Sequence, residues 1–357
     1  MQGTWAALIA SIVCAVSLNA APTPKVALLV LDKRDNSLAI VDPESLQVVG
    51  RAPSGPDPHE VVASSDGRYA YISNYGGPGS SLHTLSVVDL VSQKALPPID
   101  LGVLHSAHGL AFADDHVYFT AETSKVIGRY DPATQKLDWI LGVGQDRTHM
   151  IVVRNAGQKI FTSNVNSGTI SIIEQTTIAA GPPPGPPGMR PPPGGPGPGG
   201  PPAGRQLKDW SETAVKVGAG PEGFDVSPDG KEIWAANSHD GTVSVIDAAT
   251  KRVIQTIDAR VEFSNRLKFT AAGQKVLISS LRNGDLVIFD ASTRREDKRI
   301  QVGHGAAGIL IEPGNARAYV SCSPDDNVAV IDLKTLSIIN RIHPGREPDG
   351  LAWAVRK

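Results

Sequence analysis

The sequence has little cysteine, few aromatic residues and no excess of positive charge. Cys14 and Cys322 are its two cysteines, so a disulfide framework is excluded and the fold must be stable through an apolar core. Lysine and arginine number 34 against 36 aspartates and glutamates, which gives no support to general nucleic-acid binding. Aromatic residues make up 5%, too few for a carbohydrate- or base-binding surface made mainly of rings.

The sequence also lacks a hydrophobic run of the ~18 residues that a transmembrane helix needs. A shorter uncharged apolar stretch runs from Trp5 to Val16 and is followed by small residues up to Ala21. This pattern is typical of a secretory signal, so we predict that residues 1–20 are a signal peptide and that the mature protein is periplasmic or secreted. Because no lysine or arginine precedes the stretch, a buried N-terminal helix is the alternative.

What the sequence does contain is an internal repeat. Runs of alternating apolar residues end in an acidic residue seven times, at intervals of 42 to 47 residues once a Pro/Gly insertion of about 30 residues is subtracted. These acidic residues are Asp42, Asp89, Asp131, Glu174, Asp247, Asp290 and Asp332.

Two further positions keep the same spacing. Ten residues before most of the acidic residues another strand-like run ends, as at Asn164 and Asn237, and a glycine turn such as Asp229-Gly230 precedes that run. Each repeat therefore predicts four short antiparallel strands, and seven repeats predict an all-β, seven-bladed propeller. The run that begins at Gly350 should pair with the N-terminal strand and close the ring. A solenoid would need polar capping repeats, which neither end resembles.

One repeat carries a motif that can be compared with a known family. It reads Pro221-Glu222-Gly223-Phe224, followed by SPDGKEIWAANSHDGTVSVID. This resembles the seven-bladed YVTN-type propeller family over about residues 25–357 outside the insertion, although the family's asparagine is replaced in four repeats. The resemblance implies the propeller fold. It does not imply one activity, because relatives include binding scaffolds, lyases, lactonases and cofactor-carrying reductases.

Residues 181–204 consist almost entirely of proline and glycine. Proline cannot donate a hydrogen bond to a sheet, so we predict a disordered, polyproline-II-rich insertion over residues 176–209. It interrupts blade four, between the third and fourth strands, of a single propeller domain of residues 21–357. Two roles stay open for it: a tolerated surface loop, or a docking arm for a partner or the cell wall.

One position of the repeat carries most of the candidate site residues. It lies eight residues before the hairpin turn and opens the innermost strand of each blade, so its side chains should point at the mouth of the central channel. The seven residues are His59, His108, His149, Glu222, Asn265, Ala307 and Asp349. Because one loop from every blade converges there, we predict a ligand site on a polar rim outside the core. Its members are His59, His108, His149, Glu222 and Asp349, with Asn74, Asn164 and Asn237 at the neighbouring strand ends.

Three consecutive repeats place an imidazole at this position, in His59, His108 and His149. Three imidazoles with an open position are typical of a catalytic metal site, so a transition metal or a haem is the candidate cofactor. The alternative is that the imidazoles only form hydrogen bonds with loop carbonyls around a wet channel. No CxxCH motif occurs, which excludes covalent c-type haem.

Two classes of function remain. No nucleophile elbow, Walker A loop or HExxH motif occurs, so the leading hypothesis is an exported, non-enzymatic binding or scaffold protein. Its small ligand or protein partner would bind at the channel mouth. The alternative is a metal- or haem-dependent enzyme of the lactonase, lyase or reductase type that uses the same face. We expect a monomer. We also expect a buried, inert thiol at Cys322. For Arg260, Arg266 and Arg282 we expect solvated surface side chains, and the alternative is that they hold an anionic ligand.

Overall fold

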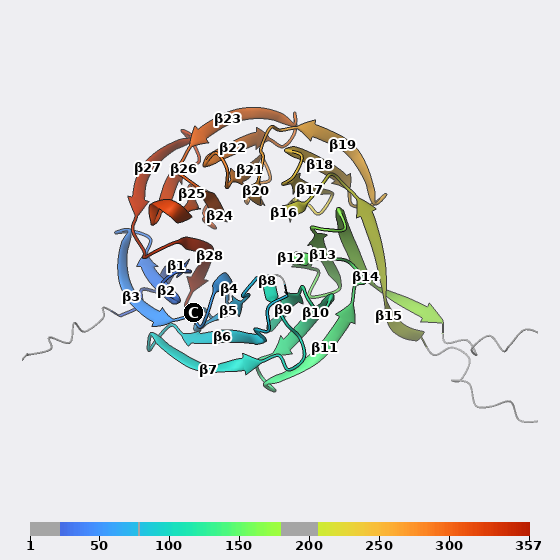
Figure 1. The fold of residues 1–357 in the computed structure, drawn as a ribbon, viewed down its shortest axis with the longest axis horizontal. Coiled ribbons are helices and arrows are strands. Elements are labelled where there is room, and N and C mark those ends of the chain that lie inside the picture. The colour runs from blue at the N-terminus through green and yellow to red at the C-terminus, as the bar shows by residue number, and fades with distance from the viewer. Residues whose placement is uncertain (1–21, 78, 180–205) are drawn as a thin grey trace, which may run out of the picture.

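The computed structural model describes residues 22–77, 79–179 and 206–357. In these ranges the chain forms seven four-stranded antiparallel sheets around a central axis (Figure 1). The predicted seven-bladed, all-β propeller is therefore confirmed. The predicted signal peptide and the Pro/Gly tract lie outside the described residues.

The blades follow one another along the chain, and the strands of each blade are named in order from the channel outward. Blade 1 has β28 (Pro348–Val355), β1 (Val26–Asp32), β2 (Ser37–Asp42) and β3 (Gln47–Pro53); blade 2 has β4 (Pro58–Ala63), β5 (Tyr69–Asn74), β6 (Thr84–Asp89) and β7 (Lys94–Asp100). Blade 3 has β8 (Ala107–Ala113), β9 (His116–Ala121), β10 (Val126–Asp131) and β11 (Lys136–Gly142); blade 4 has β12 (Thr148–Arg154), β13 (Lys159–Asn164), β14 (Thr169–Ala179) and β15 (Gln206–Lys216). Blade 5 has β16 (Pro221–Val226), β17 (Glu232–Asn237), β18 (Thr242–Asp247) and β19 (Arg252–Asp258); blade 6 has β20 (Ser264–Phe269), β21 (Lys275–Ser280), β22 (Asp285–Asp290) and β23 (Arg295–Gln301). Blade 7 has β24 (Ala306–Ile311), β25 (Arg317–Cys322), a short 3₁₀ turn η1 (Ser323–Asp325), β26 (Asn327–Asp332) and β27 (Ser337–Ile342).

The core lies between neighbouring blades, because both faces of each middle strand are covered. β17 and β21 are buried from their second residue onward, whereas the outer strand β23 carries four exposed residues in a row. Trp234 of blade 5 is fully buried and packs edge-on against Phe269 of blade 6, with ring centroids 5.9 Å apart. Charged outer strands such as β23 also protect the sheet edges from pairing with other chains.

The repeated acidic residue has a local structural role. Asp247 Oδ1 accepts hydrogen bonds from the backbone N–H groups of Ala249 and Thr250, at 3.1 and 2.6 Å. These bonds lower the pKa of Asp247 and hold the turn between β18 and β19. Asp332 makes the same contacts with Lys334 and Thr335. The most regular feature of the sequence therefore encodes turns rather than chemistry.

The ring closes as predicted. β28, at the C-terminal end, pairs antiparallel with β1, with Leu29 opposite Ala352. Blade 1 is thus built from both ends of the described chain. Within the described ranges, helical structure is limited to single short turns, and no helix has the length needed to cross a bilayer.

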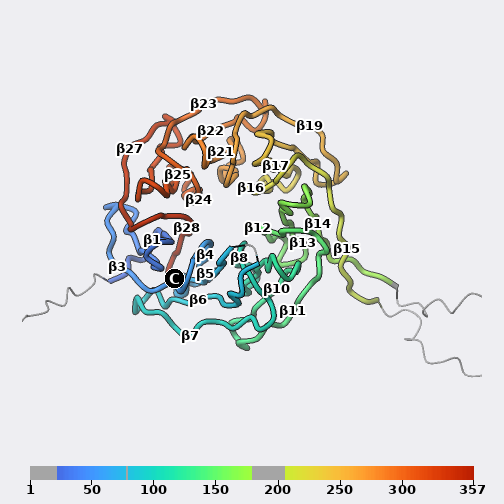
Figure 2. The backbone as a smooth tube through the Cα atoms, viewed as in Figure 1, coloured from blue at the N-terminus to red at the C-terminus, as the bar shows by residue number. Residues whose placement is uncertain are grey.

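The insertion in blade 4 begins later and ends earlier than predicted. We expected disorder over residues 176–209, but β14 and β15 remain paired from Gln175–Trp210 out to Ala179–Gln206. This hairpin extends beyond the ring as an arm (Figures 1 and 2). β-Branched residues such as Thr176 continue the strand pattern there. Trp210 also packs against Trp139 of blade 3, with ring centroids 5.0 Å apart, which holds the base of the arm.

Candidate ligand site at the channel mouth

All seven residues of the predicted site position lie second in their innermost strands. His59, for example, follows Pro58 at the start of β4, and Asp349 follows Pro348 at the start of β28. The pairing between inner and second strands shifts register just after this position in every blade. Such bulges re-aim side chains, and here they turn one residue per blade toward the channel.

A hydroxyl on the second strand fixes the backbone at this position. Thr120 Oγ1 accepts the N–H of Gly109 at 2.9 Å and donates to the carbonyl of His149, on the next blade, at 2.7 Å. Equivalent donations, at 3.0, 2.6 and 2.7 Å, run from Ser163 to Glu222, from Ser279 to Ala307 and from Ser321 to Asp349. The site residues of neighbouring blades are therefore tied together through buried hydrogen bonds that need no ligand.

The seven positions line a single cavity of about 360 Å³. Lys33, Tyr75, Arg147 and Arg266 also line it. The cavity thus combines three permanent cations with the carboxylates of Glu222 and Asp349. Its volume lies within the range of small-molecule sites, roughly 300–1,000 Å³.

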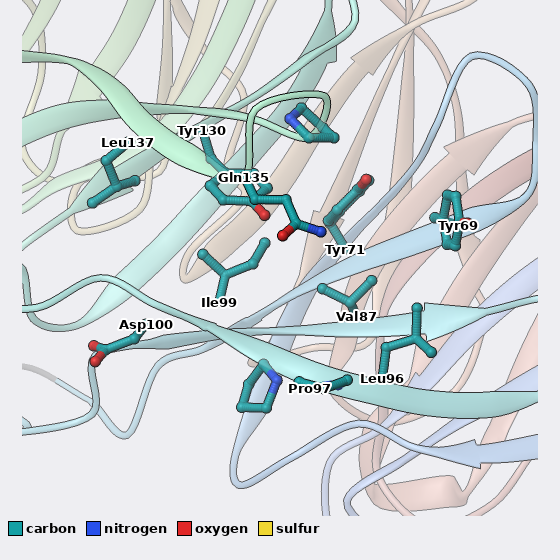
Figure 3. Close-up of a pocket in the computed structure, with 12 residues that line it drawn as sticks. Tyr69, Tyr71, Val87, Leu96, Pro97, Ile99, Asp100, Tyr130, Gln135 and Leu137 are labelled. Carbon is teal, nitrogen blue, oxygen red and sulfur yellow. The ribbon is translucent and has the colours of Figure 1, made fainter.

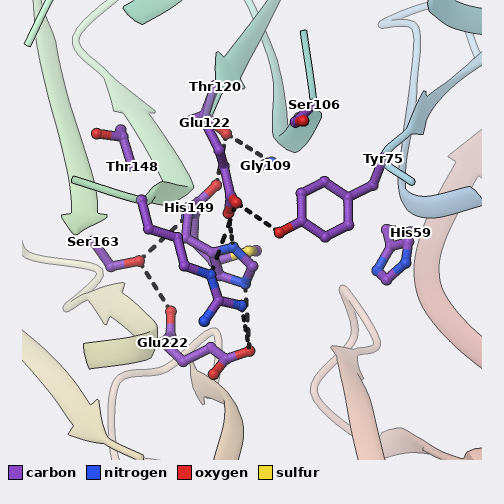
Figure 4. A network of polar contacts seen from close by, with 12 residues as sticks. His59, Tyr75, Ser106, Gly109, Thr120, Glu122, Thr148, His149, Ser163 and Glu222 are labelled. Atoms are coloured by element: carbon purple, nitrogen blue, oxygen red, sulfur yellow. Dashed lines mark hydrogen bonds and ion pairs between the residues drawn. The ribbon is translucent and has the colours of Figure 1, made fainter. Parts of the chain in front are cut away.

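A chain of buried polar contacts links four blades at one side of this cavity (Figure 4). The hydroxyl of Tyr75 donates to Glu122 Oε2 at 2.6 Å, and Glu122 Oε1 accepts from His149 Nδ1. His149 Nε2 lies 3.5 Å from Glu222 Oε1. Arg147 reaches the same two carboxylates, with its nitrogens 3.8 Å from Glu122 and 3.9 Å from Glu222. One imidazole is therefore held between two carboxylates.

This arrangement shifts the protonation equilibria of the pair. Desolvation by burial lowers the pKa of His149, but its contacts with Glu122 and Glu222 outweigh that effect, and the pKa is raised above 6.5. Burial alone would raise the pKa of Glu222, yet the His149 contact and the charge of Arg147 bring it down to about 2. The contacts with Glu122 and Glu222 thus favour the protonated form of His149, which forms ion pairs with both carboxylates.

His108 behaves in the opposite way. Its ring stacks on that of His149 with centroids 3.7 Å apart, and Tyr75 packs edge-on against it at 4.6 Å. Burial, together with the neighbouring charge of His149, lowers the pKa of His108 well below 6.5. The pKa values of two adjacent imidazoles are therefore shifted in opposite directions.

His59 closes the other side of the mouth. Its Nε2 lies 3.3 Å from Asp57, and its Nδ1 lies 3.5 Å from Asp349. Lys33 approaches the same Asp349 carboxylate at 3.5 Å. Asp349 is therefore shared between an imidazole and an ammonium group.

An ion pair crosses the channel beneath these residues. Arg266 of blade 6 donates to Glu60 of blade 2, and their side chains are 5% and 14% exposed. Both residues also line a second cavity of about 310 Å³ further along the channel. The inner end of the mouth cavity is therefore lined by Arg266, which is paired with Glu60. Our expectation that Arg266 is solvated was wrong, because its side chain reaches into the channel rather than out of a surface loop.

Several predicted site residues lie elsewhere than expected. Asn74, Asn164 and Asn237 are fully buried and do not line the cavity. The side-chain amide of Asn237, for example, donates to Thr242 and Ser244, which clasps the second and third strands of its own blade. We predicted ligand contacts for these asparagines. The pairing between the second and third strands has no register shift, however, so the amide at the end of the second strand points into the blade.

The predicted position of the imidazoles outside the core also needs correction. His108 and His149 are each 2% exposed: their rings stack on each other, Tyr75 packs against His108, and Glu122 accepts a hydrogen bond from His149. Cys322 is buried as expected, and burial raises the pKa of its thiol.

Sequence reasoning missed four residues of the site: Lys33, Tyr75, Glu122 and Arg147. A signal for them existed. Lys33, Tyr75 and Glu122 each follow directly after the last residue of a second strand, and Arg147 lies two residues before its site histidine. The residue type at these flanking positions differs from blade to blade, so a search for positions that repeat the same residue type does not find them.

The three imidazoles come together but do not form a metal-ligand set. The near-parallel stack of His108 on His149, with planes 29° apart, keeps their in-plane lone pairs from converging on one point. In the described part of the chain, no group of three or more His, Cys, Asp or Glu side chains is arranged to hold a metal ion.

The fold and the site define the protein as a seven-bladed β-propeller with a polar cavity at its channel mouth. Residues 202–310 match the family model of the cytochrome D1 heme domain. No curated protein matches the chain significantly.

Solved structures share the fold at low sequence identity. A functionally unknown protein from Desulfotomaculum acetoxidans has a TM-score of 0.69 at 10% identity, over 93% of this chain and 99% of its own. A candidate 6-phosphogluconolactonase from Bacteroides uniformis has a TM-score of 0.68 at 16% identity, over 92% and 99%. The periplasmic gluconolactonase of Pseudomonas aeruginosa has a TM-score of 0.67 at 15% identity, over 93% and 99%. At these identities the similarity establishes the fold alone.

The residues at the mouth do not fit a haem ligand. An axial ligand must present a free imidazole nitrogen. Both ring nitrogens of His59 and of His149 face carboxylates, and His108 is 2% exposed with its ring packed against three others. The segment that matches the haem family contributes no histidine to the cavity. We therefore assign no haem to this site.

Proposed function

We propose that the protein binds a small, polar organic molecule in the cavity at its channel mouth. The observation that carries this proposal is a set of buried polar atoms that form no hydrogen bond, although two of them, His149 Nε2 and Arg147 Nε, lie 3.5 and 3.8 Å from carboxylate oxygens. His108 Nδ1, His149 Nε2 and Arg147 Nε form no hydrogen bond within the described part of the chain, and their residues line one cavity. Leaving such a group unsatisfied costs about 1–3 kcal/mol, so a ligand that supplies oxygen atoms there is favoured.

The charges of the cavity restrict the class of ligand. Arg147 and Lys33 favour carboxylate, phosphate or carbonyl oxygens, whereas Glu222 and Asp349 favour hydroxyl donors. A hydroxylated acid, or a sugar-derived ester that yields one, carries both kinds of group. A large apolar ligand would leave these charges desolvated and unpaired.

Hydrolysis of a cyclic ester is a second candidate function, and the His149 arrangement favours it. Glu222 would take a proton from water as the water oxygen attacks the carbonyl carbon, and Arg147 would stabilise the negative charge on the carbonyl oxygen. When the ring C–O bond breaks, protonated His149 would give its proton to the leaving alkoxide. The proton on Glu222 could then return to His149 across the 3.5 Å that separates them. Two of the structural neighbours are named as lactonases, which supports this class.

An extracytoplasmic location also belongs to the proposal. It rests on the predicted signal peptide over residues 1–20, and one neighbour is named as a periplasmic enzyme. A non-enzymatic binding protein would use the same cavity, so location does not separate the two functions.

Calorimetry with gluconate and proton-release assays with glucono-1,5-lactone test both functions. We expect gluconate to bind with 1:1 stoichiometry and Arg147→Met to weaken binding about tenfold or more, because a hydrogen bond to a charged group is worth about 1.5–3 kcal/mol. Arg260→Met is the matched control, since Arg260 is 85% exposed at the surface.

Binding without turnover would favour the binding protein, and turnover lost in Arg147→Met would favour the enzyme. If neither probe binds, and a wider set of hydroxy acids and sugar lactones also produces no thermal shift, the proposal is wrong.

A further inference from the structure

A third cavity, of about 610 Å³, lies between blades 2 and 3, away from the channel mouth (Figure 3). We propose that this groove binds the Pro/Gly tract, residues 181–204, of the same chain. Its walls come from β5, β6 and β7 of blade 2 and from β10, β11 and the turn between them in blade 3. The inference is independent of the function proposed for the channel mouth.

The groove has the chemistry of a polyproline-binding surface. Tyr69, Tyr71 and Tyr130 line it together with Leu96 and Pro97. Aromatic-lined grooves recognise polyproline II segments, because proline rings pack on aromatic faces and the preformed helix loses little entropy on binding. The occupant therefore needs proline at high density, which residues 181–204 supply.

The polar groups of the groove point to a peptide rather than to an apolar small molecule. Tyr71 is 4% exposed, and its ring stacks on Phe112 with centroids 5.9 Å apart. Within the described part of the chain, the hydroxyls of Tyr69, Tyr71 and Tyr130 form no hydrogen bond. A polyproline II segment leaves all its carbonyl oxygens free, so it offers acceptors to such hydroxyls.

Charge complementarity favours this particular tract. Among the described residues that line the groove, Asp100 is the one charged residue; its side chain is 74% exposed, and His83 Nε2 lies 3.7 Å from its carboxylate. Arg190 is the one charged residue in 181–204. The pair would fix the direction and register of a repetitive sequence that proline packing alone cannot fix.

The tract is attached within reach of the groove. The base of its arm packs on blade 3 through Trp210 and Trp139. β11 carries Trp139 toward blade 4 and Leu137 into the groove, on opposite faces of one blade. Residues 180–205 connect the two strands of the arm. Half of that length, about 40 Å at ~3.3 Å per extended residue, exceeds the ~10 Å spacing of packed sheets together with the roughly 13 Å of arm between Trp210 and Gln206.

The test uses a synthetic peptide of residues 181–204 and two forms of the protein. In the shortened form a Gly/Ser turn replaces the tract, which the pairing of Ala179 with Gln206 permits. We expect the peptide to bind the shortened form at micromolar concentrations and the full-length chain at least tenfold more weakly, because the tethered tract competes at a high effective concentration.

Substitutions in the shortened form locate the site. Tyr130→Ala and Asp100→Asn should each weaken peptide binding at least fivefold. Ile140→Ala is the matched control, since Ile140 is 52% exposed on the same strand as Leu137 and lies outside the groove. A peptide with serine in place of every proline should not bind.

Three outcomes overturn the proposal. One is no peptide binding to the shortened form, and another is equal binding to both forms. The third is that the full-length chain dimerises through the tract, which would assign the groove to a second copy. Should the shortened form not fold, a full-length chain with serine for proline over 181–204 takes its place, with the same peptide and the same expected difference.

Discussion

Two arcs of the channel mouth have the same backbone and carry different chemistry. From β28 through β4, β8 and β12 to β16, every inner strand presents a titratable side chain at the site position. β20 and β24 present Asn265 and Ala307 at that position. Both arcs have the register shift after the site position. Both also have a second-strand hydroxyl that donates to a carbonyl of the next blade, as at Thr120 and Ser279. The features that recur in every blade therefore form the scaffold, and the residues that differ between blades at the site position carry the charges.

The largest contrast between the arcs should appear in stability. Glu122→Ala removes one partner of a buried ion pair whose side chains are 3% and 2% exposed, so we expect a loss of about 3–5 kcal/mol in the free energy of unfolding. Asn265→Ala, on the other arc, should cost only about 0.5–1.5 kcal/mol. Urea denaturation measures both. Equal losses would mean that the ion pair is no more important than an ordinary hydrogen bond.

Binding should show the next largest contrast. His149→Gln removes an imidazole whose protonated form the site favours and should weaken gluconate binding about 10- to 100-fold. Ala307→Ser, at the same position on the other arc, should change it less than about twofold. Calorimetry on the two variants decides this. If Ala307→Ser weakens binding as much, the ligand lies across both arcs.

The pH dependence of stability should distinguish the two stacked imidazoles. The pKa of His149 is raised on folding, so its contribution is complete below 6.5 and is lost as pH rises through the raised value. The pKa of His108 is lowered on folding, so the protein loses stability as pH falls below 6.5, where the unfolded chain takes up a proton.

Unfolding of the wild type, His149→Gln and His108→Phe from pH 5 to 9 tests this. The wild type should exceed His149→Gln most at low pH. The stability of the wild type relative to His108→Phe should decrease as pH falls. Parallel curves for all three proteins would show that neither pKa is shifted.

The smallest expected difference is between the stability contributions of the inter-blade hydroxyl hydrogen bonds on the two arcs. Thr120→Val and Ser279→Ala remove the same inter-blade hydrogen bonds on different arcs, so each should cost about 1 kcal/mol. Thermal unfolding with matched wild-type controls measures them. Clearly unequal costs would contradict the view that the scaffold is uniform around the ring.

The fold could be predicted because its signals are local and repeated. The glycine turns, the alternating strands and Asp247 with its equivalents each act over fewer than ten residues and recur in register. The site position could be predicted for the same reason, and all seven residues line the cavity. Asn237 was assigned to the ligand because it ends a strand next to the site position, yet its hydrogen bonds turn it into its own blade.

The sequence by itself therefore determined the seven blades, the ring closure and which residues surround the mouth. Only the tertiary structure decided that Glu122 orients His149, that His108 stacks on the same ring, and that Arg266 reaches Glu60 from a blade across the channel. The physical reason is the sequence separation between the groups that determine each feature. Strand and turn formation depend on neighbours along the chain, whereas charge and orientation in a buried site depend on groups more than twenty residues apart that the closed ring brings into contact.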